Sequence, residues 1–110
     1  MTTTLMIRYK THDAQAAENE ALVRGVFDEL RARGPAGLRY ETYRLADGAT
    51  FVHLVKMQDR DRNPLTATPA FQAFQKNLKA RCVEAPVVTE WVAVDSYTSA
   101  SSEGGRGQRP

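Results

Sequence analysis

Cysteine and histidine are scarce in this sequence. The single cysteine, Cys82, excludes an internal disulfide bond and any cysteine-rich zinc site. The two histidines, His12 and His53, leave little material for a metal centre. The sequence also lacks a glycine-rich phosphate loop, the serine nucleophile elbow of hydrolases and the paired-histidine pattern of zinc proteases. We therefore expect a protein that uses neither a metal ion nor another cofactor.

A large excess of one charge and a long apolar run are absent as well. There are 15 Lys and Arg residues against 13 Asp and Glu residues, a net charge of +2, which predicts no nucleic-acid partner. No stretch approaches the roughly 18 apolar residues of a membrane-spanning helix. Residues 1–10 do not form a signal peptide, because Arg8 interrupts their apolar part. We expect a cytoplasmic protein without a membrane partner, in a compartment where a free thiol persists.

The length of 110 residues corresponds to one domain. Apolar residues (42%) and charged residues (25%) occur at ordinary globular frequencies, which excludes disorder of the whole chain. The composition changes at residue 98, because segment 98–110 contains no large apolar residue. We expect a folded domain at 1–97 and a disordered tail at 98–110, since the tail has no apolar surface to bury.

Hydrophobic periodicity and turn residues indicate six main elements. Asp13 is a candidate N-cap of the first helix, and Gly34 followed by proline ends that helix. An Asp-Gly pair at 47–48 predicts a hairpin. Two residues that precede proline compete as the start of the second helix, and we prefer Thr68 to Asn63. The expected elements are a strand at 4–10, a helix at 14–33, strands at 38–45 and 51–57, a helix from residue 68, and a strand at 87–95.

The element order βαββαβ is that of the ferredoxin-like α+β fold, in which a four-stranded antiparallel sheet carries both helices on one face. Two helices leave the other face of the sheet uncovered, and a face with large apolar side chains needs a second cover. Because the chain offers no further element, we expect a homodimer whose sheets meet face to face. The third strand has large side chains on both faces: Val52 and Leu54 on one, and Phe51, His53, Val55 and Met57 on the other.

Two stretches carry a family resemblance: GLRYETYRLADGATFVHLVKMQD at 37–59 and TPAFQAFQKNL at 68–78. They resemble the antibiotic biosynthesis monooxygenase family, whose members are small dimeric α+β barrels. The resemblance extends over residues 4–95 and implies the dimeric α+β barrel fold. Relatives in this family include cofactor-free oxygenases, haem-degrading enzymes, cyclases and isomerases, so the resemblance implies several activities.

His53 is the main catalytic candidate. Strand periodicity places it on one face with Phe51 and Met57, and the resemblance implies that this face lines the barrel lumen, away from the helices. A near-neutral imidazole in a small pocket is suited to act as a general base. The alternative is a histidine that is held by hydrogen bonds inside a dimer interface.

Arg8 is the candidate anion-binding residue. If its neighbours Leu5, Ile7 and Tyr9 face the helices, Arg8 points into the lumen, where a guanidinium is suited to hold a carboxylate or an enolate. The alternative is a structural ion pair with Glu41 or Glu90, because a buried charge is costly unless it is paired.

Aromatic and sulfur-containing side chains complete the candidate substrate-binding set. Tyr40 and Tyr43 point to opposite faces of their strand, so that one packs in the core and the other borders the pocket or the dimer rim. Trp91 is either a core residue or a stacking surface for an aromatic ligand. The substrate-binding residues that we expect are Arg8, Tyr43, Phe51, Met57 and Trp91.

The first functional hypothesis is a cofactor-independent monooxygenase-like enzyme that acts on a small aromatic or polyketide-like substrate. His53 removes a proton from an electron-rich phenol, and the resulting carbanion reduces dioxygen directly. Met57 stands where the family often has tryptophan, and this favours an alternative, a non-redox barrel that binds a small molecule or acts as a cyclase or isomerase. A third alternative is a structural dimer without a pocket.

Overall fold

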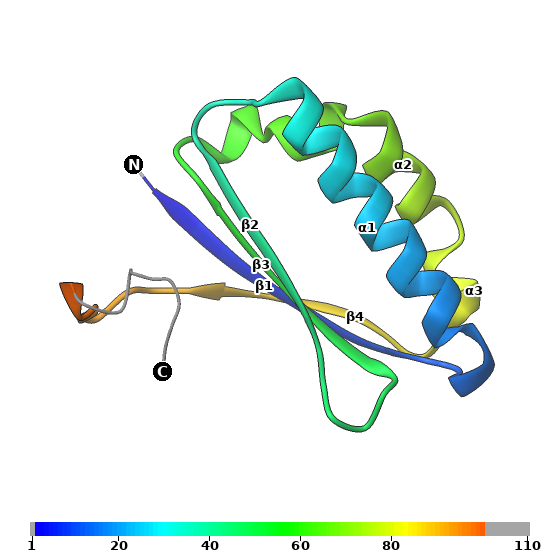
Figure 1. Cartoon of the computed structure of the whole chain (residues 1–110). Helices are drawn as coiled ribbons and strands as arrows, with labels where there is room; N and C mark the ends of the chain where they lie inside the picture. The colour runs from blue at the N-terminus through cyan, green and yellow to red at the C-terminus, as the bar shows by residue number, and fades with distance from the viewer. Residues whose placement is uncertain (1, 101–110) are drawn as a thin grey trace.

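The computed structural model describes residues 2–100 and shows a four-stranded antiparallel sheet with its helices on one face (Figure 1). The strand order is β2-β3-β1-β4, which confirms the predicted ferredoxin-like α+β fold. The predicted tail falls mainly on residues 101–110, outside the described part of the chain. The main elements are β1 (Thr3–Thr11), α1 (Ala16–Arg33), β2 (Leu38–Arg44), β3 (Thr50–Met57), α2 (Pro69–Lys76), α3 (Leu78–Arg81) and β4 (Cys82–Trp91).

Helix α1 ends as predicted but begins differently. A 3₁₀ turn at Asp13–Gln15 precedes α1, and no side chain caps either of these two elements. The predicted Asp13 N-cap is therefore wrong, and Asp13 lies inside the turn instead. At the other end, Gly34 adopts a left-handed conformation with φ 59°, and its N–H donates to the carbonyl of Leu30 at 2.7 Å. Glycine suits this position because it lacks the Cβ that would clash there.

Both candidate starts of the second helix are used. The Asn63 side chain accepts a hydrogen bond from the Leu65 N–H at 3.0 Å and begins a 3₁₀ turn at Pro64–Ala67. Thr68 then precedes the proline that begins α2. A break at Asn77 separates α2 from the short helix α3. The two starts are consecutive, and together they bury Leu65 beneath the helical layer.

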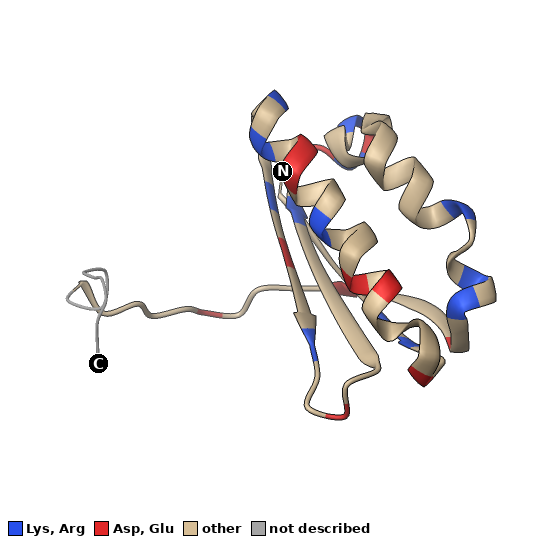
Figure 2. Ribbon diagram, turned by 45° about the vertical axis from the view of Figure 1, so that its right-hand side comes forward, with Lys and Arg blue, Asp and Glu red and all other residues tan. Residues whose placement is uncertain are grey.

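Strand β4 is an edge strand that begins and ends earlier than predicted. It spans Cys82–Trp91 rather than 87–95, and Pro86 lies inside it. The pairing of β4 with β1 changes register between Arg8 and Lys10, beside the part of β4 that contains Pro86. An edge strand with such an irregularity accommodates proline, which has no N–H for the sheet. The chain after Trp91 leaves the sheet and extends away from the body (Figures 1 and 2).

The inner face of the sheet is built from the odd-numbered residues of β1 and β3. Cross-strand pairing places Ile7 opposite His53 and Tyr9 opposite Phe51. The His53 ring lies 5.5 Å from the ring of Phe74 in α2, so His53 is between the sheet and the helices. The predicted orientation of His53, away from the helices, is therefore wrong. Periodicity shows which residues of β3 share a face but not which face the helices cover.

The outer face of the sheet, opposite the helices, is partly apolar. Its centre contains the half-buried side chains of Met6, Val52 and Leu54. Tyr43 and Trp91 lie on the edge strands of this face and are 52% and 47% exposed. Acidic and basic residues are spread over the helices, the strands and the loops rather than gathered on one element (Figure 2). Among the described residues, no helix is long and apolar enough to cross a membrane.

Candidate functional site

A cavity of about 370 Å³ lies between the inner face of the sheet and the helices α2 and α3. Its volume is within the range of about 300–1,000 Å³ that is typical of small-molecule sites. Apolar and aromatic side chains make up most of the wall, while a few polar groups from β1, β2 and β3 reach it. The lining residues are Ile7, Tyr9, Tyr40, His53, Val55, Leu65, Phe71, Phe74, Gln75, Leu78, Lys79, Pro86 and Val88.

His53 is the centre of a hydrogen-bonded group in the cavity wall. Its Nε2 lies 2.8 Å from the Tyr9 hydroxyl, and its Nδ1 lies 2.5 Å from the Tyr40 hydroxyl. Thr42 Oγ1 is a further neighbour of Nδ1, at 3.1 Å. The sheet register explains the arrangement, because Thr42 is directly opposite His53 on β2, and Tyr40 and Tyr9 are two residues away on the same face. Neither ring nitrogen is free to contact a ligand directly.

A second part of the network connects the imidazole to the start of α1 and the end of α3. Asn19 Nδ2 donates to the Tyr9 hydroxyl at 2.8 Å. Arg81 Nε donates to Asn19 Oδ1 at 3.0 Å, and Arg81 Nη2 donates to the Phe74 carbonyl at 2.7 Å. Asn19 and Arg81 are both buried. A continuous chain of buried hydrogen bonds therefore joins Arg81 to the imidazole through Asn19 and Tyr9.

Burial keeps the His53 imidazole and the Tyr9 and Tyr40 hydroxyls of the cavity wall neutral at neutral pH. It lowers the pKa of His53 to about 4, because the imidazolium form loses its hydration inside the protein. It raises the pKa of Tyr40 to about 12, against a smaller opposing effect of a hydrogen bond with Thr42. It also raises the pKa of Tyr9, against the opposing hydrogen bond from Asn19. The group is suited to donate and accept hydrogen bonds, and a strong base is absent from it.

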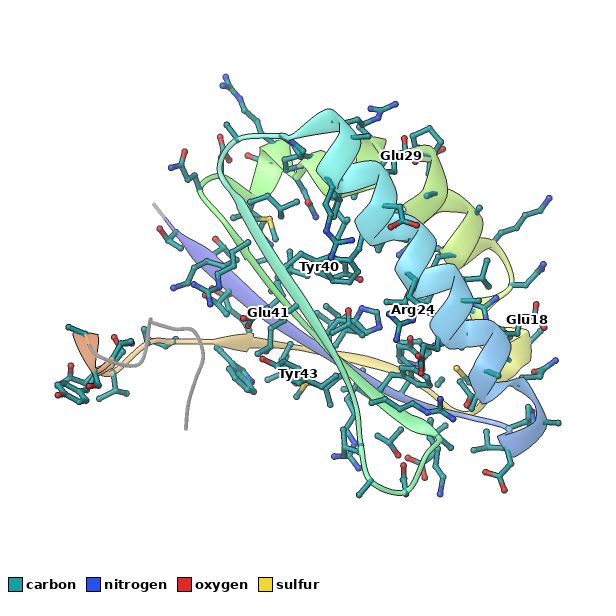
Figure 3. The ribbon with its side chains drawn as sticks, viewed as in Figure 1. Glu18, Arg24, Glu29, Tyr40, Glu41 and Tyr43 are labelled. Carbon is teal, nitrogen blue, oxygen red and sulfur yellow. The ribbon has the colours of Figure 1, made fainter. Side chains whose placement is uncertain are left out.

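Aromatic rings surround the imidazole. The Tyr9 ring stacks on the Phe51 ring with their centroids 5.6 Å apart, and the Tyr40 ring stacks on the Phe27 ring of α1 at 4.8 Å. Figure 3 shows Tyr40 pointing into the space between the sheet and the helices. Such a wall favours a flat apolar ligand, since aromatic rings prefer stacked or edge-to-face contacts.

The structure does not bring the six predicted site residues together. His53 lines the cavity, while Phe51 and Met57 are buried on the same face without lining it. The other three predicted residues, Arg8, Tyr43 and Trp91, lie on the outer face, on the far side of the sheet from the cavity. Figure 3 shows this separation for the tyrosines of β2, which point to opposite sides.

The alternative ion pairs that we considered for Arg8 are also wrong. Glu41 pairs with Arg39 at 3.1 Å, and Glu90 pairs with Arg60 at 3.1 Å. Arg8 itself is exposed on the outer face, opposite Val52. An exposed arginine needs no buried carboxylate, so the reason for expecting a partner disappears.

Sequence reasoning overlooked two residues of the site, Tyr9 and Tyr40. The available signal was the alternation of β1, which groups Tyr9 with Leu5 and Ile7 on one face, but the helical side was only a condition in the argument about Arg8. Tyr40 was considered together with Tyr43, but nothing in the sequence showed which of the two faces the helices. Within residues 2–100, no group of three or more His, Cys, Asp or Glu side chains is arranged to hold a metal ion.

No protein-family model matches the sequence, and no curated protein matches it either. Solved structures do match. SnoaB, a cofactor-independent oxygenase from Streptomyces nogalater, is 23% identical with a TM-score of 0.66, and the match covers 89% of this chain and 98% of SnoaB. Rv0793 from Mycobacterium tuberculosis is 18% identical with a TM-score of 0.71, over 89% of this chain and 100% of Rv0793.

A further match is a structure described as an antibiotic biosynthesis monooxygenase. It is 18% identical to this chain with a TM-score of 0.71, over 86% of this chain and 100% of its own. The identities are low, so these matches establish the fold alone. The chain has the fold of the antibiotic biosynthesis monooxygenase structures, as the sequence resemblance predicted.

Proposed function

We propose that the chain is a cofactor-independent monooxygenase-like enzyme that acts on a small aromatic or polyketide-like molecule in the inner cavity. The observation that carries this proposal is the hydrogen-bonded Tyr9–His53–Tyr40 group in the wall of a mostly apolar, aromatic-lined cavity. Such a cavity binds a flat apolar molecule and orients it with a few polar contacts. The shared fold with the oxygenase SnoaB supports the same class of reaction.

The proposed reaction converts an activated methylene group of the substrate into a carbonyl group. The substrate loses one methylene proton to solvent water, which gives a carbanion whose negative charge is shared with a ring oxygen. The carbanion transfers electrons to dioxygen, and one oxygen atom becomes the new carbonyl. The other oxygen atom leaves as water with the second methylene hydrogen and the proton returned from the solvent. The aromatic wall shields one side of the intermediate, and the Tyr40 hydroxyl stabilises the ring oxygen. In this role His53 acts through Tyr40 and does not contact the substrate.

Oxygen consumption with an anthrone-like substrate tests the proposed activity. We expect uptake of dioxygen and, with ¹⁸O₂, one labelled oxygen atom in the product. Tyr40→Phe should lower kcat/KM by about 10²–10³, the range for removing one oxyanion donor, whereas Tyr43→Phe on the outer face should leave it unchanged. The absence of oxygen uptake with anthrone-like and dihydroxynaphthoquinone substrates would contradict the proposal.

A non-redox barrel that binds or isomerises a small molecule is the second candidate. The specific observation in its favour is the lowered pKa of His53, which leaves that imidazole a weak base for removing a substrate proton. Turnover that persists without dioxygen would favour this second function over the first.

We also propose that the protein is a homodimer built on the outer face of the sheet. That face has an apolar centre at Met6, Val52 and Leu54. The segment after β4 extends from the body and exposes Val92 and Val94, which are 83% and 97% accessible. Large apolar side chains on a projecting segment have no cover within one chain, and a two-fold partner offers each copy a matching surface.

A further inference from the structure

Arg81 is a buried arginine without an acidic partner among the described residues. Its side chain is 3% exposed, and its charge is satisfied by Asn19 Oδ1, the Phe74 carbonyl and the Phe74 ring, whose centroid is 5.3 Å from the guanidinium carbon. A guanidinium has N–H groups only, so it donates hydrogen bonds and never accepts them. Arg81 therefore sets the direction of every hydrogen bond that depends on it.

The donor and acceptor of each hydrogen bond are fixed in order, from Arg81 to Asn19 and then to Tyr9. Because Arg81 Nε must donate, the Asn19 atom that it contacts is the carbonyl oxygen, and the amide orientation is fixed. The amide nitrogen of Asn19 then faces the Tyr9 hydroxyl and donates to its oxygen. Among residues 2–100, the one other partner of that hydroxyl is His53 Nε2, and the Tyr9 proton is left for it.

The same logic assigns the tautomer of His53. If Nε2 accepts the Tyr9 proton, then the neutral imidazole carries its own proton on Nδ1. This Nδ1–H donates to the Tyr40 oxygen at 2.5 Å, with Thr42 Oγ1 as a second acceptor at 3.1 Å. Tyr40 already accepts a hydrogen bond from the imidazole in this arrangement, so its own proton points away from Nδ1 and is available to Thr42 or to an acceptor oxygen in the cavity.

We propose that Arg81 fixes the direction of the hydrogen-bond series Asn19–Tyr9–His53–Tyr40, so that Tyr40 presents a hydrogen-bond donor to the cavity. The cavity therefore selects a ligand with an acceptor oxygen, which is either a ring carbonyl or an oxyanion. This inference rests on the proposed function only in assuming that the cavity binds a small molecule. The donor–acceptor direction of this hydrogen-bond series is a property of the protein without any ligand. Asn19, Arg81 and Tyr9 act here as positioning residues, because they reach the ligand only through the imidazole and Tyr40.

The first experiment measures the His53 tautomer in the free protein at neutral pH. Long-range ¹H–¹⁵N correlation spectra distinguish a protonated ring nitrogen from an unprotonated one. We expect a protonated Nδ1 and an unprotonated Nε2 for His53, with the exposed His12 as the internal reference. A proton on Nε2 would overturn the proposed direction, whatever the cavity binds.

The second experiment uses Asn19→Asp, a nearly isosteric change, to reverse the direction of the hydrogen bond between Tyr9 and His53. The introduced carboxylate accepts from Arg81 and also from the Tyr9 hydroxyl, so the Tyr9 oxygen must now accept a proton from His53 Nε2. We expect the tautomer signature of His53 to switch. An unchanged tautomer in a folded variant would contradict the role of Asn19. If the variant does not fold, the spectrum of the unchanged protein still decides the direction.

The third experiment compares two ligands of nearly equal shape, anthrone and 9,10-dihydroanthracene, which lacks the carbonyl oxygen. We expect anthrone to bind more tightly, by the roughly 2- to 12-fold that one hydrogen bond contributes. Tyr40→Phe should remove this preference, and Tyr43→Phe on the outer face should keep it. Equal affinity for the two ligands would overturn the acceptor selectivity. If neither ligand binds, the proposed function and the ligand class both fail, while the tautomer result stands by itself.

Discussion

His53 is a buried neutral imidazole, and this makes the stability of the protein depend on pH. Its pKa is about 4 in the folded state and 6.5 as the ordinary value, so the unfolded chain takes up the proton first as the pH falls. The stability that the neutral His53 imidazole contributes is complete above pH 6.5 and is lost as the pH falls from 6.5 to 4. We expect the free energy of unfolding to decrease by about 3 kcal/mol over that interval.

Urea denaturation at a series of pH values measures this decrease. The side chains around the imidazole are Tyr9, Tyr40, Thr42 and Phe74. In the described part of the chain, the nearby positive charges are Arg81, which is joined through Asn19, and Lys79, which lines the same cavity. None of these groups titrates between pH 4 and 6.5, so His53→Asn should flatten the curve there. A wild-type curve as flat as that of the variant would contradict the assignment.

Arg81 should contribute more to stability than any exposed arginine of the chain. Arg81→Met removes the donor to Asn19 Oδ1 and to the Phe74 carbonyl, and both acceptors remain buried. We expect a loss of about 3 kcal/mol, because each buried unsatisfied polar group costs about 1–3 kcal/mol. Arg31→Met is the control, since Arg31 is largely exposed and should change the free energy of unfolding by less than about 0.5 kcal/mol. Equal losses for the two variants, measured by urea denaturation, would refute this expectation.

At the scale of elements, the connection between β3 and α2 contains a side-chain cap at Asn63. The Asn63 side chain accepts from the Leu65 N–H at the start of the 3₁₀ turn that buries Leu65. Asn63→Ala should therefore lower the free energy of unfolding by about 1 kcal/mol. Asn77→Ala is a matched control, because the Asn77 side chain caps nothing at the start of α3. A larger loss for Asn77→Ala, in the same thermal or urea experiment, would rule out the cap as the cause.

Sequence patterns predicted the order of the elements well and the ends and faces of the strands less well. The start of α2 was found because a residue before proline has a local physical meaning. The start of β4 was missed because Pro86 suggested a boundary, and only the edge position of β4 makes proline acceptable inside it. The inward orientation of His53 depends on which face α2 covers, a non-local fact that strand periodicity does not contain.

At the scale of the whole molecule, the fold was predictable and the assembly remains a prediction. We expect sedimentation or light scattering to give twice the mass of the chain at low-micromolar concentration. Val94→Asp should shift the protein to a monomer, because it places a charge on a segment that we expect to be buried against the partner. Ala36→Asp, in the exposed loop between α1 and β2, should leave the dimer intact. A monomeric mass for the wild-type chain would exclude the proposed dimer.

Pro86 has a consequence for the way in which this sheet meets other sheets. β4 is an open edge, and an exposed edge is a template on which strands of further copies add without limit. Pro86 offers no N–H to such a strand, and the change of register beside it disturbs the regular ladder that an added strand would need. Face-to-face association uses each surface once and stops at two copies, whereas edge pairing would continue into fibres. Pro86 and the irregular register beside it therefore make the β4 edge a poor template for a strand of a further copy.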